Sequence, residues 1–321
     1  MDIKRAIENQ KEIFDMLKKT KENNRLSHAY LFYGDKGTGK KEMAYALACM
    51  MYCKNGGCLT CDTCKTIIEG NHLNIDYIGI DENKTMISKE QINALQEEFS
   101  KTSLVDGVRI YIVDGIDTAS TAAQNSLLKF IEDPQNKTDT IGIFLATDLS
   151  NVVNTIKSRC ILEHFKSLSI SSQAKILNDM GIDELDSILV SSITNDIDLA
   201  KNIALSDEFL MIKNIFLEML DLKTDADKVY FYLKYQNVFS VSENLDYLIS
   251  WFILFIEDSN IYMNNSSSLI LYPLCDKIKM YKNKYNSVLK DKMKLSLEEY
   301  NKIKYNVIPK NIFHEFLTKV I

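Results

Sequence analysis

The chain has 321 residues, of which 26% are charged and 46% are hydrophobic, and it carries a formal net charge of −6 at pH 7. This balance excludes a disordered or fibrous protein, and the length predicts more than one globular domain. The acidic charge excludes a protein that holds nucleic acid through its overall charge, for which a basic domain is expected.

The amino-terminal segment mixes charged residues with apolar residues at helical spacing, and it lacks the apolar core and cleavage site of a secretion signal. The longest apolar run, Leu245–Ile256, is interrupted by Asp246 and Ser250 and is shorter than the roughly 20 residues that span a bilayer. We therefore expect a cytoplasmic protein that does not contact a membrane, with a buried helix in this run.

Five apolar segments resemble buried strands, and stretches of helical periodicity separate them. This alternation predicts an α/β domain with a parallel sheet over residues 1–165. Strand-like segments become sparse after this point, which predicts a small helical domain over 166–206 and an all-helical domain over 207–321. The expected strands are Ala29–Tyr33, Asp76–Ile80, Val108–Val113, Ile141–Ala146 and Ile161–Phe165.

A glycine-rich segment follows the first expected strand and precedes an amphipathic helix at Glu42–Met51. This context is typical of a P-loop, in which backbone N–H groups hold phosphate oxygens and a lysine, here Lys40, reaches the β and γ phosphates. The alternative is a glycine-rich turn that only joins the strand to the helix. The candidate nucleotide-binding residues of this segment are Gly34, Gly37, Thr38, Gly39, Lys40 and Lys41.

The residue after the P-loop lysine is Lys41, where an active ATPase has a serine or threonine whose hydroxyl binds Mg²⁺. An ammonium group cannot coordinate a cation, so this residue argues directly against catalysis. We therefore expect that the chain does not hydrolyse ATP, and the binding of ATP and Mg²⁺ remains open.

Four cysteines lie close together in the segment 53–64, as two overlapping Cys-x-x-Cys steps and one cysteine five residues earlier. Two glycines between them permit a tight reversal of the chain. This arrangement predicts a structural Zn²⁺ site, because four protein ligands leave no open position for water. An iron–sulfur cluster, a redox pair and unrelated free cysteines are the alternatives. The candidate ligands are Cys53, Cys58, Cys61 and Cys64.

The strand expected at Val108–Val113 is followed by Asp114, the position at which P-loop ATPases carry a carboxylate on the metal side. The next residue, where a hydrolase has a glutamate, is Gly115, and Asp117 lies too far along the chain to be taken as a substitute. The alternative role of Asp114 is to cap the turn after a buried strand.

These segments and several others occur in the order found in bacterial clamp-loader subunits, and the chain closely resembles this AAA+ family of DNA polymerase III. The resemblance is dense from His28 to Phe165. It implies an AAA+ sheet, a helical lid and a carboxy-terminal helical collar that joins five subunits. The further segments that carry the resemblance are Arg25–Gly34, Ile87–Ile92, Ala123–Pro134 and Thr155–Cys160.

The segment Ser158-Arg159-Cys160 resembles the family's Ser-Arg-Cys motif, whose arginine is presented to ATP bound by the neighbouring subunit. The resemblance implies that Arg159 is an arginine finger acting in trans, which stabilises charge on the transferred phosphoryl group. Without the motif, such an arginine would be interpreted as a solvated or salt-bridged surface residue. Thr147 resembles the family's first sensor position, whereas Thr194–Ala200 contains no second-sensor arginine.

The resemblance as a whole implies an accessory subunit that supports ATP-driven loading of the sliding clamp and does not hydrolyse ATP itself. Its implied partners are the tau/gamma ATPase subunits and delta in a hetero-pentamer, the sliding clamp, and primer–template DNA reached through the complex. Two alternatives are a catalytically active tau/gamma-like ATPase and a zinc-dependent nucleic-acid-binding module.

Overall fold

The structure is a computed structural model that describes residues 1–81, 84–101, 106–132, 140–262, 269–305 and 307–321. It divides into two compact units, Met1–Leu168 and Ser169–Ile321. The end of the Ala123–Pro134 motif lies outside the described residues. No helix within these ranges is both long enough and apolar enough to cross a membrane.

Five strands form one parallel sheet among the described residues of the amino-terminal unit, in the order β2-β3-β4-β1-β5. β1 lies between β4 and β5, and its Leu31 is opposite Phe144 of β4 and Leu162 of β5. The predicted parallel sheet is confirmed. Its strands are β1 (Ala29–Tyr33), β2 (Ile75–Ile78), β3 (Arg109–Asp114), β4 (Thr140–Ala146) and β5 (Ile161–His164).

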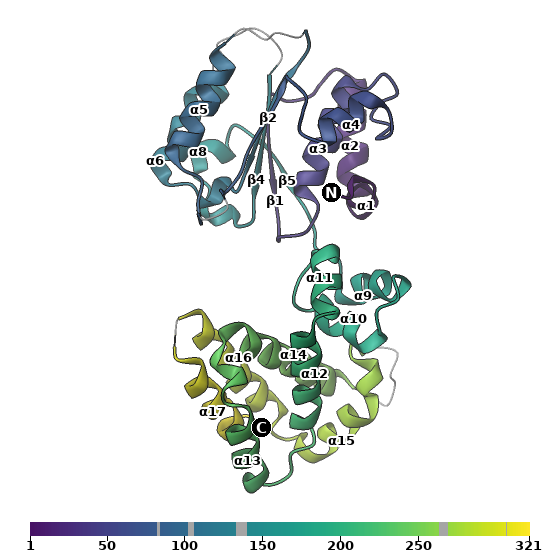
Figure 1. Cartoon of the computed structure of the whole chain (residues 1–321), viewed down its shortest axis with the longest axis vertical. Helices are drawn as coiled ribbons and strands as arrows, with labels where there is room; N and C mark the ends of the chain where they lie inside the picture. The colour runs from purple at the N-terminus through teal and green to yellow at the C-terminus, as the bar shows by residue number, and fades with distance from the viewer. Residues whose placement is uncertain (82–83, 102–105, 133–139, 263–268, 306) are drawn as a thin grey trace. The chain divides into compact units, whose positions relative to one another are not determined.

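Helices cover both faces of the sheet (Figure 1). Successive residues of a strand point to opposite faces, so Tyr30 and Phe32 pack on one helical layer and Ala29 and Leu31 on the other. The first layer contains α1 (Ile3–Asn9), α2 (Lys11–Glu22), α3 (Lys40–Tyr52) and α4 (Asp62–Ile68). The second contains α5 (Lys89–Ser100), α6 (Thr121–Ser126), α7 (Leu128–Glu132) and α8 (Asn154–Lys157), with the 3₁₀ turns η1 (Ile116–Thr118) and η2 (Leu149–Asn151).

The carboxy-terminal unit is helical throughout its described residues. The apolar run predicted to be a buried helix lies within α14, where Trp251 is fully buried and donates a hydrogen bond from its indole nitrogen to the carbonyl of Leu189 (3.0 Å). The predicted boundary at residue 206, between a lid and a collar, stays a prediction. The helices are α9 (Ile170–Asp179), α10 (Glu184–Ser191), α11 (Ile197–Ala204), α12 (Asp207–Met219), α13 (Asp225–Tyr235), α14 (Ser242–Ile261), α15 (Cys275–Tyr285), α16 (Leu289–Lys304) and α17 (Pro309–Lys319), with the turns η3 (Val238–Ser240) and η5 (Tyr272–Leu274).

Side-chain caps set the starts of several helices. The Ser88 hydroxyl accepts a hydrogen bond from the Gln91 N–H, the Gln91 side-chain oxygen accepts one from the Ser88 N–H, and this capping box begins α5. Thr224 and Asp227 form the same arrangement at the start of α13. Each cap satisfies backbone N–H groups that the first turn of a helix leaves without a partner.

Candidate functional site

The P-loop-like segment connects β1 to α3 at the carboxyl edge of the sheet, where ligands of parallel α/β proteins bind. Gly34 has φ +146°, and a Cβ atom there would lie 2.2 Å from the carbonyl oxygen of Phe165. Only glycine therefore fits this first position. Gly37 and Gly39 are also left-handed, with φ +83° and +87°, which turns the chain into the start of α3.

Lys40 is 8% exposed, and its ammonium group donates hydrogen bonds to the carbonyls of Gly34 (2.7 Å) and Asp35 (2.6 Å). Burial lowers the pKa of Lys40 from its usual range, and the carboxylates of Asp114 and Asp117 oppose this effect. The P-loop lysine is thus directed into the loop itself, where carbonyl oxygens take the place of phosphate oxygens.

Gln10, which precedes the P-loop in the sequence, stabilises it through hydrogen bonds. Its side-chain amide donates to the carbonyls of Thr38 (3.2 Å) and Lys166 (2.7 Å), and the side chain is buried. Thr38 in turn donates from its hydroxyl to the carbonyl of Asp35 (2.8 Å). Gln10 could not be predicted as a site residue, because no sequence motif links a residue in the turn between α1 and α2 to the P-loop.

Lys41 and Asp114, the residues on the expected metal side of the loop, both contact Tyr77 of β2. The Lys41 ammonium lies 3.9 Å from the centre of the Tyr77 ring. The Tyr77 hydroxyl donates a hydrogen bond to Oδ2 of Asp114 (2.7 Å). Burial and this carboxylate together raise the pKa of the Tyr77 phenol, so it remains a donor at any physiological pH.

Gly115 and Asp117 follow Asp114 in a left-handed turn. Gly115 has φ +96°, a conformation that L-residues with a side chain rarely adopt. Oδ2 of Asp117 accepts hydrogen bonds from the backbone N–H groups of Thr147 (3.0 Å) and Asp148 (2.8 Å). Asp117 therefore ties the end of β3 to the end of β4, the predicted sensor position, and its side chain is engaged in structure.

These residues do not fit a Mg²⁺ ion held in the manner of an active P-loop ATPase. The position after Lys40 offers an ammonium group in place of a hydroxyl, and one oxygen of Asp114 already accepts a hydrogen bond from Tyr77. Gly115 has no carboxylate to orient water. The site keeps the backbone form of a phosphate loop, but it lacks the hydroxyl after Lys40 and the carboxylate after Asp114 that an active ATPase uses.

Arg159 lies after α8 and before β5, and its side chain is 36% exposed. Its guanidinium donates to Oε1 of Glu132 (2.5 Å from Nε) and to the carbonyl of Thr155 (2.9 Å). Glu132 lies in the Ala123–Pro134 motif, so two separate segments of the predicted family pattern meet here. The pair holds the arginine at the surface in a defined orientation.

The four predicted cysteine ligands converge. Their sulfur atoms all lie within 4.8 Å of one another, with Cys53 Sγ 3.6 Å from Cys58 Sγ and 3.7 Å from Cys61 Sγ. A tetrahedron of sulfurs about 2.3 Å from a central zinc has edges of about 3.8 Å, so the spacing suits that metal. All four cysteines are free thiols. The other three cysteines lie outside this cluster.

Hydrogen-bond donors around the cysteine cluster favour the thiolate form of two of its sulfurs, those of Cys53 and Cys58. The N–H of Cys58 donates to the sulfur of Cys53 (3.4 Å) and is the largest cause of the lowered pKa of that thiol. N–H and hydroxyl donors of Thr60 lower the pKa of Cys58 to about 6. Burial raises the pKa of Cys64. The predicted tight reversal is present, with Gly56 and Gly57 at φ +68° and +91°.

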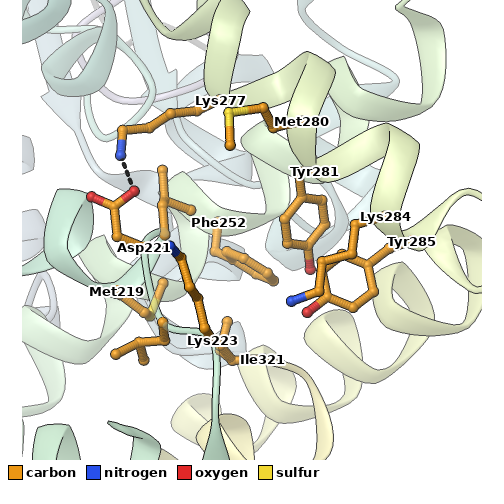
Figure 2. A pocket seen from close by; sticks show the side chains of 12 residues that line it. Met219, Asp221, Lys223, Phe252, Lys277, Met280, Tyr281, Lys284, Tyr285 and Ile321 are labelled. Carbon is orange, nitrogen blue, oxygen red and sulfur yellow. Dashed lines mark hydrogen bonds and ion pairs between the residues drawn. The ribbon is translucent and has the colours of Figure 1, made fainter.

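A cavity of about 210 Å³ lies within the carboxy-terminal unit, among α12, α14 and α15 (Figure 2). Its wall includes Phe252, Met280 and Tyr281, and Lys277 at the rim pairs with Asp221. None of the predicted site residues lines it. This cavity has no signature in the sequence, since its wall comes from segments far apart in the chain.

Comparison with known proteins identifies relatives of this chain. Residues 9–169, half of the 321 residues, match the family described as "DNA polymerase III, delta subunit". The chain is 38% identical over 203 residues to DNA polymerase III subunit delta' of Bacillus subtilis, which covers 62% of this chain and 60% of that protein.

Two further relatives are more distant. DNA polymerase III subunit tau/gamma of Haemophilus influenzae is 31% identical over 67% of this chain and 33% of that protein. DNA polymerase III subunit delta' of Pseudomonas aeruginosa is 27% identical over 52% of each. Each match thus covers less than two thirds of the relative. Among solved structures, a gamma subunit-related protein of Thermotoga maritima is similar with a TM-score of 0.49 and 13% identity, over 95% of this chain and 97% of that chain.

Proposed function

The chain belongs to the DNA polymerase III delta-subunit family, and from this premise we propose that it is a delta-prime-type subunit of a bacterial clamp loader. In this role it supports ATP-driven loading of the sliding clamp onto primed DNA without hydrolysing ATP itself. Its partners are the tau/gamma ATPases and delta in a hetero-pentamer, with the clamp and primer–template DNA reached through that complex, in the cytoplasm.

One observation carries the proposal: Lys41 and Gly115 stand where an active ATPase has its metal-binding hydroxyl and its water-orienting carboxylate, while Arg159 is present and held at the surface. Lys41 and Gly115 remove the hydroxyl and the carboxylate on which hydrolysis depends. The ion pair with Glu132 holds the charged guanidinium of Arg159, with its N–H donors, at the protein surface. A chain with this combination can assist hydrolysis in a neighbouring subunit while its own site remains inactive.

Arg159 acts in this proposal as an arginine finger in trans. Its guanidinium leaves Glu132 and donates to the γ-phosphate oxygens of ATP bound by the adjacent ATPase. A finger stabilises charge that develops as the phosphoryl group transfers, and is worth about 10³-fold or more in rate. The surface pair with Glu132 is weak enough to exchange, since exposed ion pairs contribute about 0–1 kcal/mol.

The test is Arg159→Ala in a loader reconstituted with its ATPase and delta-type subunits. Hydrolysis at the site that receives Arg159 should fall by about 10³-fold, and assembly on a sizing column should be unchanged. Lys157→Ala, which removes a neighbouring cation, is the matched control and should leave turnover intact. Unchanged turnover in the Arg159→Ala loader would refute the finger.

The four-cysteine cluster is proposed to bind one structural Zn²⁺. The sulfur spacing and the four free thiols support this assignment, and such a site, when loaded, cross-links the end of α3 to the start of α4. The ion has no part in phosphate chemistry, because four thiolates leave it no open position.

The second candidate is a working ATPase of the tau/gamma type, which the similarity to the Haemophilus influenzae protein over 67% of this chain favours. Phosphate release by the purified chain separates the two functions. We expect no turnover above background, whereas turnover that disappears in Lys40→Ala would establish the ATPase.

A further inference from the structure

We propose that Tyr77 and Lys41 together occupy the metal side of the P-loop, so that Tyr77 is a second residue, outside every recognised motif, which excludes Mg²⁺ from this site. The inference deepens the proposed function and rests on one part of it, the assignment of the P-loop as the nucleotide site. It differs from a simple loss of ligands, because two side chains fill the place that the ion would take.

Lys41, Tyr77 and Asp114 contact one another in that order and so connect α3 to β3. Lys41 is the second residue of α3, and its ammonium lies 3.9 Å from the centre of the Tyr77 ring. The Tyr77 hydroxyl donates to Oδ2 of Asp114 (2.7 Å). Since β2 and β3 are neighbouring parallel strands in which Ile78 pairs with Val113, the register brings the Tyr77 side chain beside the end of β3.

These contacts take over two roles that Mg²⁺ has in an active site: they provide a partner for the Asp114 carboxylate and a positive charge on the metal side of the loop. A bound Mg²⁺ would neutralise the carboxylate of Asp114 and would take oxygen ligands in octahedral geometry. Here the hydroxyl of Tyr77 satisfies one carboxylate oxygen, and Lys41 places a positive charge over one face of the same ring. A divalent ion at Oδ2 of Asp114 would have to displace the hydrogen bond, and it would meet the positive charge of the Lys41 ammonium.

Replacement of only one of these two side chains should therefore not be enough to let Mg²⁺ bind. Lys41→Thr restores the missing hydroxyl, but Tyr77 still covers Asp114. Tyr77→Phe frees the carboxylate, but the ammonium of Lys41 remains. Only the double variant offers Mg²⁺ two oxygen ligands, the hydroxyl of the new threonine and the freed carboxylate oxygen of Asp114.

The experiment measures binding of a fluorescent ADP analogue, mant-ADP, with Mg²⁺ and without it in the presence of a chelator. Four proteins are compared: the wild type, Lys41→Thr, Tyr77→Phe and the double variant. The expected result is that only the double variant binds mant-ADP more tightly with Mg²⁺, by about tenfold or more. The other three should show no Mg²⁺ dependence, whatever their affinity for the nucleotide.

Tyr45 provides a matched control, because it is a buried tyrosine whose ring centre lies 6.4 Å from that of Tyr77. The described residues contain no hydrogen bond between its hydroxyl and Asp114. Lys41→Thr combined with Tyr45→Phe should thus behave like Lys41→Thr alone. Tyr77→Leu combined with Lys41→Thr is a second route to the open site, and thermal melts check that each variant folds.

Two results would overturn the inference. In one, Lys41→Thr alone gains the Mg²⁺ dependence, which would show that Tyr77 does not obstruct the metal. In the other, neither double variant at Tyr77 gains it, which would show that the obstruction lies elsewhere. Neither result bears on Arg159, whose test reads ATP turnover at a neighbouring subunit's site.

Discussion

At the scale of single residues, Gly115 shows why the lost carboxylate is not simply restored. Its φ of +96° is a conformation in which a side chain is strained, and a Cβ atom there would lie 3.3 Å from Cδ1 of Ile80. The turn is held in place by Thr118, whose hydroxyl donates to the carbonyl of Gly115 (2.7 Å). The backbone conformation at residue 115 therefore favours glycine over any residue with a side chain.

We predict that Gly115→Glu lowers the free energy of unfolding by about 1–3 kcal/mol and creates no ATP turnover. Urea denaturation and a phosphate-release assay measure the two effects. Gly115→Asn is the control, because asparagine tolerates the left-handed region better and should cost less. A Gly115→Glu protein as stable as the wild type would show that this turn is free to rearrange.

At the scale of elements, the cysteine loop joins α3 to α4 through four sulfurs. The two helices pack on the same face of the sheet, and the loop between them contributes the buried Cys53 and Cys64 and the partly buried Leu59 to the core. A bound ion would supply the cross-link that a small hydrophobic contact cannot.

We predict one zinc per chain, measured by metal analysis of protein purified without added metal. Cys58→Ser combined with Cys61→Ser should abolish binding and lower the thermal midpoint, because the loop loses its cross-link. Cys49→Ser is the matched control, since Cys49 is buried nearby but lies outside the cluster. A coloured iron–sulfur species would contradict the zinc assignment.

A second element-scale feature is an ion-pair network between α16 and α17. Lys302 bridges Glu299 (2.8 Å) and Glu315 (2.6 Å), and Lys319 also contacts Glu315 (2.6 Å). Hydrogen bonds from Lys302 and Lys319 lower the pKa of Glu315 to about 2. Since the folded pKa is below the unfolded one, the stabilisation is complete above about pH 4.3 and is lost as the pH falls towards 2.

We predict that Glu315→Gln lowers the free energy of unfolding by about 0.5–1 kcal/mol at neutral pH, a value suited to a partly exposed network. The difference from the wild type should shrink between about pH 4 and pH 2, because the wild-type carboxylate then takes up its proton. Urea denaturation across this range is the measurement. Glu298→Gln is the control, because its partner Lys294 is 4.0 Å away. A pH-independent difference would mean that the effect is not electrostatic.

At the scale of the whole molecule, the net charge of −6 limits what the chain does alone. Binding to DNA through phosphates requires clusters of lysine and arginine and is strongly salt-dependent. An acidic chain without such a cluster should have little affinity for DNA of its own, and the proposed role requires none.

We predict that the isolated chain binds primer–template DNA weakly, with a dissociation constant of about 10⁻⁵ M or weaker at physiological salt, as for non-specific binding. Fluorescence anisotropy over a range of salt concentrations tests this. Tight binding with a steep loss at high salt would favour the zinc-dependent nucleic-acid-binding module. The reconstituted loader is the positive control.

Much of the architecture could be predicted from local pattern. β1 has the predicted bounds Ala29–Tyr33, and β2 begins at Ile75, one residue before the prediction. The family was also predicted, because its motifs are short, contiguous and ordered along the chain, and the match over residues 9–169 confirms it. Boundaries were less accurate, since hydrogen bonding at strand ends depends on the neighbouring strand.

Local sequence is enough to establish which groups are present: a glycine-rich loop with Lys40 and Lys41, four clustered cysteines, Asp114 without a following glutamate, and Arg159. The loop glycines and the clustered cysteines can be recognised because they lie within a few residues of one another. The surroundings of these groups come from the folded chain. Tyr77 meets Lys41 and Asp114 through the pairing of β2 with β3, and Arg159 meets Glu132 across 27 residues. Such contacts depend on strand order and packing, which no single segment encodes.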